Sequence, residues 1–477
     1  MLLSDALRRA DPRDLEGLRK ALSASDAESR LSPIGLRRIE IGEDALPQLP
    51  QLISEMTNAR RLVVLMDSTP MRRKDADLKP KVLRLLAAHF DVTPVVLRAR
   101  NAELHADEET VVEAQEGVQK ADCVVALGSG TIADVSKEAT RRAGVPRLVI
   151  VQTAASVNAF SDNLAVLLRN GVKRTLPCRW PDALLIDLPT LAFAPPAMNR
   201  AGFGDLLALW TAPADWYLAW VLGMDPTFHP APISMLLDQG RELLDNADSL
   251  QRSAPKGLEL LARVLTLSGI AMGIVGSSAP LSGVEHLISH LIDIEAELAG
   301  RPLALHGAQV GISAVVVAGA WEILLEEFDP RAVNLDRCHP NPETLRPLVR
   351  NAFDRIDATG QAAEECWSDY SQKLVRWCTS SRLEEFLRCW DIHRSELRKI
   401  TVPQNVLAAA LREAGAPVRY SELEPPTPSD AVRWALGSCH FMRNRFTVAD
   451  LLFFLGLWNE DFTERLLRRA QSAGGGL

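Results

Sequence analysis

The feature that most constrains the fold is an alternation of short apolar runs with amphipathic segments in the first half of the chain. The apolar runs lie at 36–41, 61–66, 92–97, 123–127 and 148–152. Segments with helical periodicity, such as 106–120 and 132–143, separate them. This order predicts βαβ units and a Rossmann-like parallel sheet with helices on both faces. A nucleotide would bind at the carboxyl ends of such strands.

The chain changes character near residue 188. Beyond it the strand-like alternation disappears and helical patterns run onward, so the second domain is predicted to be all-α. A chain of 477 residues is long enough for two or more domains. The predicted division is an N-terminal helical extension at 1–35, a dinucleotide-binding α/β domain at 36–188 and an all-helical domain at 189–470. The Gly-rich segment 474–476 is expected to be disordered.

Composition excludes some classes of partner. A formal charge of -8 argues against nucleic acid or an anionic membrane as the main ligand. The seven cysteines include no CxxC pair, which is typical of reduced thiols in the cytoplasm. The N-terminus lacks the apolar core and cleavage site of a signal peptide. The apolar stretch 310–325 is interrupted by Glu322 and too short to span a bilayer, so we expect a buried helix and a cytoplasmic protein without a transmembrane segment.

A glycine-rich turn follows one of the predicted strands. Its residues are Gly128, Ser129, Gly130 and Thr131, and the helical segment behind it carries Asp134 and Lys137. Glycines at a strand-to-helix turn let backbone N–H groups approach a diphosphate, and the helix N-terminus favours negative charge. The segment is neither GxGxxG nor a P-loop. From these residues alone, a dinucleotide site and an ordinary turn both stay open.

Asp67 ends another strand-like run, where an acidic side chain can hydrogen-bond a ribose hydroxyl. The alternative is a cap on the turn that follows. Arg72 and Arg73 come close behind and are placed to receive a 2′-phosphate instead. The choice between NAD and NADP therefore stays open.

Polar residues at two further places are candidates for ligand contacts. Thr153 and Ser156 lie just past a strand and would put small hydroxyls beside a cofactor or substrate. The run 170–175 has the pattern of a hairpin turn with two cations, Lys173 and Arg174. These cations are candidates for a substrate phosphate, with a solvated turn as the alternative.

Three of the nine histidines lie in one apolar stretch of the second domain. His286 and His290 are four residues apart and would share one face of a helix, and His306 follows after a segment that can fold back. Each is either a hydrogen-bonded core residue or a metal ligand, because an unpaired imidazole is costly to bury. A catalytic divalent ion usually takes three protein ligands and an open position. Asp205 is the candidate for the missing ligand, with a helix N-cap as the alternative.

Several motifs resemble those of the sn-glycerol-1-phosphate dehydrogenases, which form a larger group with glycerol dehydrogenase, iron-dependent alcohol dehydrogenases and dehydroquinate synthase. The similarity covers about residues 36–460 in consistent order. The motifs are GSGTIADVSK (128–137), TAAS (153–156), NGVKRT (170–175), AGFGDLL (201–207), SGVEHLISH (282–290), LHGAQVG (305–311) and HFMRNRFTVADLLFFLG (440–456).

The resemblance implies a dehydroquinate synthase-like fold, with a Rossmann-like domain, a helical metal-binding domain and an active site in the cleft between them. By motif, Asp205, His286 and His306 match the metal ligands, with Zn²⁺ as the expected ion and Ni²⁺ or Fe²⁺ as alternatives. Leu209 stands where iron-dependent alcohol dehydrogenases have a further histidine. The dinucleotide segment is matched by Gly128, Ser129, Gly130, Asp134 and Lys137, and the residues near the nicotinamide by Thr153 and Ser156.

The implied reaction is hydride transfer between NAD(P) and C2 of dihydroxyacetone phosphate or glycerol phosphate, with the metal polarising the C2 oxygen. His290 is expected to deliver a proton or to orient a ligand. Lys173 and Arg174 are expected to contact the substrate phosphate. The expected partner is a small phosphorylated triose or polyol, and the chain is expected to form a homo-oligomer.

Two departures from the family pattern bear on the substrate. Asn158 stands where the family usually has an aspartate, and Asp162 stands where it has a small hydroxyl residue, so both are candidates for substrate contacts. Asn cannot act as a base and presents both a donor and an acceptor. Ala133 also replaces the usual Asn of the glycine-rich motif. The alternatives are a lyase or cyclase that uses bound NAD transiently, as in dehydroquinate synthase, and a catalytically silent relative.

Overall fold

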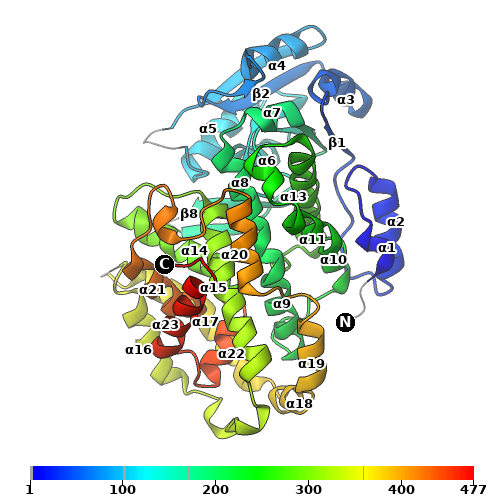
Figure 1. Cartoon of the computed structure of the whole chain (residues 1–477). Helices are drawn as coiled ribbons and strands as arrows, with labels where there is room; N and C mark the ends of the chain where they lie inside the picture. Colours follow the sequence, from blue (N-terminus) through cyan, green and yellow to red (C-terminus); the bar gives the residue numbers. More distant parts are fainter. Residues whose placement is uncertain (1–3, 100–103, 170–171, 358) are drawn as a thin grey trace. The chain divides into compact units, whose positions relative to one another are not determined.

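The computed structural model describes residues 4–99, 104–169, 172–357 and 359–477 (Figure 1). The chain forms two compact units, each assembled from separated stretches of sequence. One contains the residues up to Leu206 together with Pro230–Ser278, and the other contains Leu207–His229 and Ala279–Leu477. We call them the α/β unit and the helical unit.

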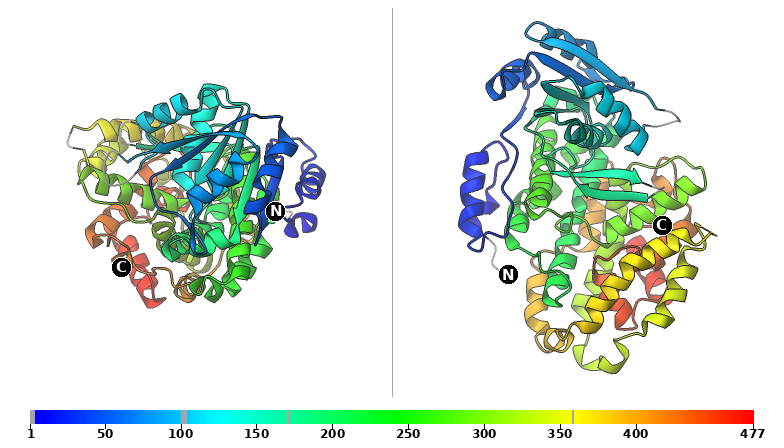
Figure 2. Two further views of the ribbon diagram at one scale, coloured as in Figure 1. Left: turned by 90° about the horizontal axis from the view of Figure 1, so that it is seen from above. Right: turned by 180° about the vertical axis from the view of Figure 1, so that it is seen from behind.

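A six-stranded parallel sheet forms the centre of the α/β unit, in the order β1-β10-β7-β6-β2-β5 (Figure 2). Its strands are β1 (Arg38–Gly42), β2 (Arg61–Asp67), β5 (Asp91–Leu97), β6 (Cys123–Gly128), β7 (Arg147–Gln152) and β10 (Ala183–Asp187). The first five confirm the predicted strands to within two residues. Sequence reasoning missed β10, which joins β1 to β7.

Two small antiparallel pairs accompany the sheet. They are β3 (Arg72–Arg73) with β4 (Ala76–Asp77), and β8 (Leu164–Arg169) with β9 (Val172–Pro177). The second pair is a hairpin at the predicted place, and the predicted turn residues 170–171 lie outside the described residues.

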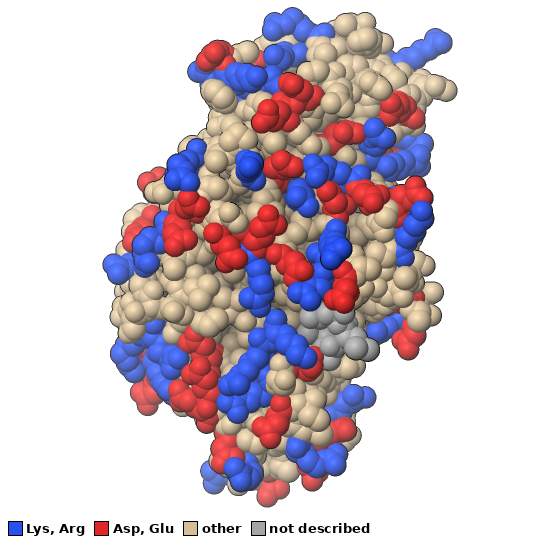
Figure 3. Space-filling model, turned by 45° about the vertical axis from the view of Figure 1, so that its right-hand side comes forward, with Lys and Arg blue, Asp and Glu red and all other residues tan. Residues whose placement is uncertain are grey.

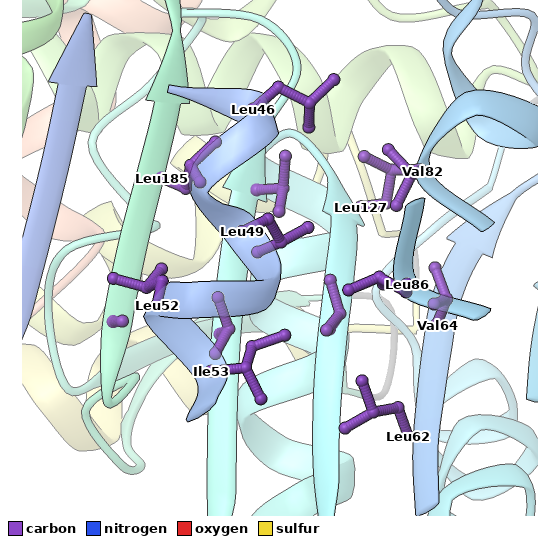
Figure 4. Packing of buried hydrophobic residues seen from close by; sticks show 14 of the residues in the cluster. Leu46, Leu49, Leu52, Ile53, Leu62, Val64, Val82, Leu86, Leu127 and Leu185 are labelled. Atoms are coloured by element: carbon purple, nitrogen blue, oxygen red, sulfur yellow. The ribbon is translucent and has the colours of Figure 1, made fainter. Parts of the chain in front are cut away.

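Both faces of the sheet are covered, which explains the continuous apolar runs of the strands. Alternate residues such as Leu62, Val64, Leu127 and Leu185 point to one face and pack against helices α3 and α4 (Figure 4). Helices α5 and α6 contact the same strands but contribute nothing to this cluster. The helices of the α/β unit are α1 (Asp5–Arg8), α2 (Leu15–Ser25), α3 (Leu49–Met56), α4 (Leu78–Ala87), α5 (Glu108–Val118), α6 (Gly130–Ala143), α7 (Leu188–Phe193), α8 (Pro196–Leu206), α10 (Pro230–Ser234), α11 (Leu237–Asp245), α12 (Asp248–Gln251) and α13 (Pro255–Val275).

The two units divide the chain differently from the predicted domains. Helix α13 contacts α7, α8 and β1, so these helices belong with the sheet although they follow residue 188. The predicted N-terminal extension forms α1 and α2, and α1 contacts α10 and α11 within the same unit. The domain limits 1–35, 36–188 and 189–470 therefore stay a prediction from the sequence. The two compact units group the elements in a different way.

The helical unit is built around helices α14 (Val284–Leu298) and α15 (His306–Glu327), which pack against each other. Its other elements, apart from four three-residue 3-10 helices, are η2 (Leu207–Trp210), α9 (Ala212–Val221), α16 (Pro342–Phe353), α17 (Gln361–Thr379), α18 (Leu383–Arg388), α19 (Trp390–Leu397), α20 (Gln404–Glu413), α21 (Ser429–Ser438), α22 (Val448–Phe454) and α23 (Glu460–Ser472). The Gly-rich segment is ordered, contrary to the prediction. The backbone N–H of Gly476 donates to Val418, and its carbonyl accepts from Tyr420, so hydrogen bonds offset the freedom of the glycines.

Two helices, α13 and α15, are long and apolar enough to cross a membrane by length and composition. In the most apolar window of each, 83% and 94% of the residues are buried inside the protein, which is typical of core helices. On the face shown in Figure 3, acidic and basic side chains are interspersed rather than gathered by sign. All seven cysteines are free thiols.

Candidate active site

The glycine-rich turn lies at the carboxyl edge of the sheet. Strand β6 ends at Gly128 and α6 begins at Gly130, with Ser129 as its N-cap. A Cβ atom on Gly128 would lie 2.5 Å from the Ile132 side chain, so this tight turn requires glycine. The N–H of Thr153 donates to the Gly128 carbonyl at 3.0 Å. The parallel pairing of β6 and β7 thus brings the two predicted cofactor segments together at the N-terminus of a 14-residue helix.

Lys137 is the centre of a buried ion cluster about two turns into α6. Its Nζ atom lies 2.7 Å from Asp162 Oδ1 and 3.2 Å from Asp134 Oδ1, and it also donates to the carbonyls of Ala159 and Leu164. The hydrogen bonds to Asp162 and to the two carbonyls occupy the three N–H groups of the ammonium, and Asp134 adds an ion pair. Lys137 therefore fastens the loop before β8 to α6, and the contact with the dinucleotide that the family resemblance implies for it stays a prediction.

The cluster shifts the protonation of all three groups. Burial raises the pKa of Asp134 to about 7 against the attraction of Lys137, and burial likewise raises the pKa of Asp162. Burial opposes the charge on Lys137, but the two carboxylates outweigh it and raise its pKa. Asp162, which the sequence placed beside the substrate hydroxyls, is 3% exposed in this cluster. Its contact with substrate stays a prediction.

The residues predicted to bind the ribose or its 2′-phosphate form hydrogen bonds within the protein. The Asp67 carboxylate at the end of β2 accepts from the N–H and hydroxyl of Thr69, both at 3.0 Å, which is the turn cap of the alternative interpretation. The guanidinium of Arg73 is buried and donates to both oxygens of Asp187, at 2.8 and 3.0 Å. This pairing raises the pKa of Arg73 and removes it as a candidate for a 2′-phosphate. Arg72 is exposed.

The loop after β7 is tightly held. Thr153 and Ser156 are each 8% exposed, and the N–H of Ala155 donates to Asn199 Oδ1 of α8 at 2.9 Å. Asn158 is half-buried, and its carbonyl accepts from the N–H of Ser161. Sequence reasoning missed Asn199, although an amide in an apolar helix is a usable signal.

The predicted phosphate contacts lie on strand β9. The side chain of Lys173 lies outside the described residues, and Arg174 is half-buried. Their contact with a substrate phosphate stays a prediction.

The three histidines converge. His286 and His290 lie on α14 and His306 begins α15, and their ring centroids are 6.2, 5.3 and 5.3 Å apart. The exposed fractions of His286 and His290 are 9% and 8%. The predicted spacing on one helical face, with a second helix folding back, is thus confirmed.

Asp205 is in the last turn of α8, which excludes the N-cap alternative. It comes two residues before η2, and η2 packs against α15, the helix that begins at His306. One ligand atom each from Asp205, His286 and His306 lie within 4.8 Å of one another. A carboxylate oxygen with two imidazole nitrogens is a donor set suited to a divalent ion with an open coordination position. His290, Asp293 and His306 form a second such group.

Three polar residues around the histidines were missed from sequence. Glu285 is fully buried, and its carboxylate contacts His286 Nδ1 at 2.9 Å and Thr211 Oγ1 at 2.8 Å. Ser289 Oγ lies 3.1 Å from His306 Nδ1, and Gln309 lies behind Ser289. The signal was a charged or polar residue in an otherwise apolar helical run, which is costly to bury without a partner.

Comparisons of sequence and structure identify known proteins that this chain resembles. Residues 40–195 match the family model of iron-containing alcohol dehydrogenases. A glycerol-1-phosphate dehydrogenase (NAD(P)+) of Bacillus licheniformis is 28% identical over 92% of this chain and 94% of that protein. The protein of the same name from Halalkalibacterium halodurans is 32% identical over 61% of this chain and 71% of its own. The crystal structure of a probable glycerol dehydrogenase from Sinorhizobium meliloti superposes with a TM-score of 0.55 and 16% identity over 92% of this chain and 98% of that chain.

The similar crystal structures define the class of fold: the chain has the fold shared by glycerol dehydrogenases and iron-containing alcohol dehydrogenases. Sequence likeness narrows the class, and the chain belongs to the glycerol-1-phosphate dehydrogenase family of NAD(P)-dependent, metal-containing oxidoreductases. The fold and the family expected from the motifs are both confirmed.

Proposed function

We propose that this protein catalyses the metal- and NAD(P)-dependent interconversion of dihydroxyacetone phosphate, or a closely related small ketone or its phosphate, with the corresponding alcohol. The observation that carries the proposal is the proximity of Asp205, His286 and His306 in a chain of this family. When bound, the nicotinamide supplies the hydride and the divalent ion, Zn²⁺ in the simplest case, polarises the substrate oxygen. A cytoplasmic homo-oligomer is part of the proposal.

The chain's own residues divide the work. Asp205, His286 and His306 hold the ion, and the backbone N–H groups of the glycine-rich turn hold the diphosphate at the α6 N-terminus. Burial around the histidines excludes water from the reacting atoms and strengthens electrostatic interactions there. In this proposal His290 exchanges a proton with the substrate oxygen through Nδ1 or Nε2, which its ring centroid 5.3 Å from that of His306 supports.

Substrate selection is where this chain departs from the family pattern, because Asn158 replaces the usual aspartate. An amide in place of the usual carboxylate offers the substrate hydroxyls an NH₂ donor group and an acceptor oxygen, and it carries no charge. The carboxylate four residues on, Asp162, is paired with Lys137. We therefore infer that a ketone flanked by a neutral hydroxyl binds here, and that Asn158→Asp shifts the preference among substrates without changing metal content.

The test is a panel of free and phosphorylated triose ketones and polyols, followed by absorbance of the reduced nicotinamide with NAD(H) and with NADP(H). We expect turnover of dihydroxyacetone phosphate that zinc restores after chelation. A lyase of the dehydroquinate synthase type would instead release phosphate without net change in reduced cofactor. No cofactor oxidation with any ketone in the zinc-loaded protein would refute the dehydrogenase.

His286→Ala tests the metal ligands directly. Removing one of three ligands should abolish stoichiometric zinc, measured by elemental analysis, and lower kcat/KM by at least about a thousandfold, because the Lewis acid contributes several kcal/mol. His89→Ala is the matched control, since His89 is an exposed histidine of the α/β unit. Full activity of metal-free His286→Ala would remove the metal from the reaction.

A further inference from the structure

The two histidines proposed as metal ligands have their Nδ1 atoms held in different ways. His286 Nδ1 lies 2.9 Å from the carboxylate of Glu285, the preceding residue. His306 Nδ1 lies 3.1 Å from the hydroxyl of Ser289, in the second turn of α14. A hydroxyl can donate or accept, so by itself Ser289 leaves the proton of His306 undetermined.

The residues behind Ser289 decide the direction. Ser289 Oγ donates to Gln309 Oε1 at 2.9 Å, and Gln309 Nε2 donates to Asp293 Oδ1 at 3.0 Å. All three side chains are at most 1% exposed, so water does not compete for these bonds. Asp293 Oδ1 accepts from the amide of Gln309, which turns the NH₂ group of that amide toward Asp293 and its oxygen toward Ser289.

The orientation of the Gln309 amide determines the direction of the next two hydrogen bonds. The Ser289 hydroxyl has one hydrogen, and Gln309 Oε1 takes it. The hydroxyl can then only accept from His306, which places the imidazole hydrogen on Nδ1. The lone pair of His306 is consequently on Nε2, the atom that a metal ligand must present when Nδ1 is hydrogen-bonded.

We propose that Asp293, Gln309 and Ser289 are positioning residues that fix the tautomer and ring orientation of His306 for metal binding. The relay does for His306 what Glu285 does directly for His286. This inference rests on the proposed function only in assigning the metal to His306, because the tautomer itself is a property of the metal-free protein.

The first experiment reads the tautomer without metal or substrate. Long-range ¹H–¹⁵N spectra of the metal-free full chain, labelled at histidine and recorded where the imidazole is neutral, distinguish Nδ1–H from Nε2–H, and loss of a signal in His306→Ala assigns it. We expect His306 to carry Nδ1–H. Observing Nε2–H at His306 in the wild-type protein would overturn the inference, whatever the activity.

The second experiment measures metal affinity. Ser289→Ala and Gln309→Met each break the relay, and we expect zinc affinity, from competition with a chromophoric chelator, to fall about 10–100-fold. Ser313→Ala is the matched control, because Ser313 is a buried serine on α15 whose hydroxyl bonds to Tyr420 and the Gln309 carbonyl instead of the relay. It should bind zinc like the wild type.

The outcomes separate the two proposals. If Ser289→Ala and Gln309→Met bind zinc as tightly as Ser313→Ala, the relay has no role and the inference is wrong. If the tautomer and the affinities are as expected but no ketone is reduced, only the proposed function fails. Should both relay variants fail to fold by circular dichroism, the spectrum of the wild-type protein still decides.

Discussion

At the scale of single residues, burial decides which charged side chains serve the fold. Lys137 and Asp162 were expected beside ligands; their side chains pair with each other in a buried cluster, and the ligand contacts stay predictions. The histidines differ, because their spacing predicted that they share a helical face and meet a second helix, and their rings do converge. Glu285 and Gln309 could not be assigned from sequence, since their partners depend on how α14 and α15 pack.

Asp134 should make stability depend on pH in a direction unusual for an aspartate. Its pKa is raised from 3.8 to about 7 in the folded protein, so between these values the folded state binds a proton that the unfolded state has lost. This group's contribution to the free energy of unfolding therefore falls as pH rises from about 4 to 7.

The prediction is that Asp134→Asn gains stability relative to the wild type over that pH range, measured by urea denaturation at several pH values. Asp75→Asn, which changes an exposed aspartate, is the control. A difference between Asp134→Asn and wild type that is flat or declines with rising pH would contradict the raised pKa.

At the scale of elements, the hydrophobic pattern of the sequence predicts where strands and helices lie, but it does not predict which elements pack against each other. Five strands were visible as apolar runs because both faces of the sheet are buried. Strand β10 was missed because its five residues, flanked by Pro181 and Pro189, fall where the pattern turns helical. Local periodicity likewise does not predict that α8 packs against the loop after β7. Gly202 is the one hint in the sequence of α8, because a glycine permits such a close approach.

Gly202→Ala should be destabilising. A Cβ atom at this position would lie 1.9 Å from the carbonyl oxygen of Ala155, so backbone must move. We expect a loss of roughly 1–3 kcal/mol in the free energy of unfolding, typical of overpacking. The control is Gly437→Ala in α21, where nothing lies within 4 Å and alanine should stabilise the helix by up to about 1 kcal/mol. Equal effects of the two substitutions would show that α8 is not packed so closely.

At the scale of the whole molecule, residues far apart in sequence have to meet for the proposed chemistry. The family resemblance supplied Asp205, because nothing in its local sequence distinguishes a ligand from a cap. Each compact unit draws on two separate stretches of chain, which a division into consecutive domains cannot represent.

Zinc should stabilise the folded chain because its ligands are together only in the native state. At a free zinc concentration a hundred times Kd, the free energy of unfolding should rise by about 2.7 kcal/mol. Thermal denaturation with zinc and with chelator measures this rise, and His89→Ala should behave like the wild type. His286→Ala should show no zinc-dependent change, and an equal rise in that variant would place the ion elsewhere.

The position of β10 has a consequence for synthesis of the protein on the ribosome. β1 is translated first among the strands of the sheet, yet the one described strand that pairs with it there is β10, which is translated last. At about 5–20 residues per second, the nascent β1 waits on the order of ten seconds with its backbone groups unpaired. A chaperone or the ribosome surface has that interval in which to shield it, and translational pauses placed before residue 183 would prolong the exposure.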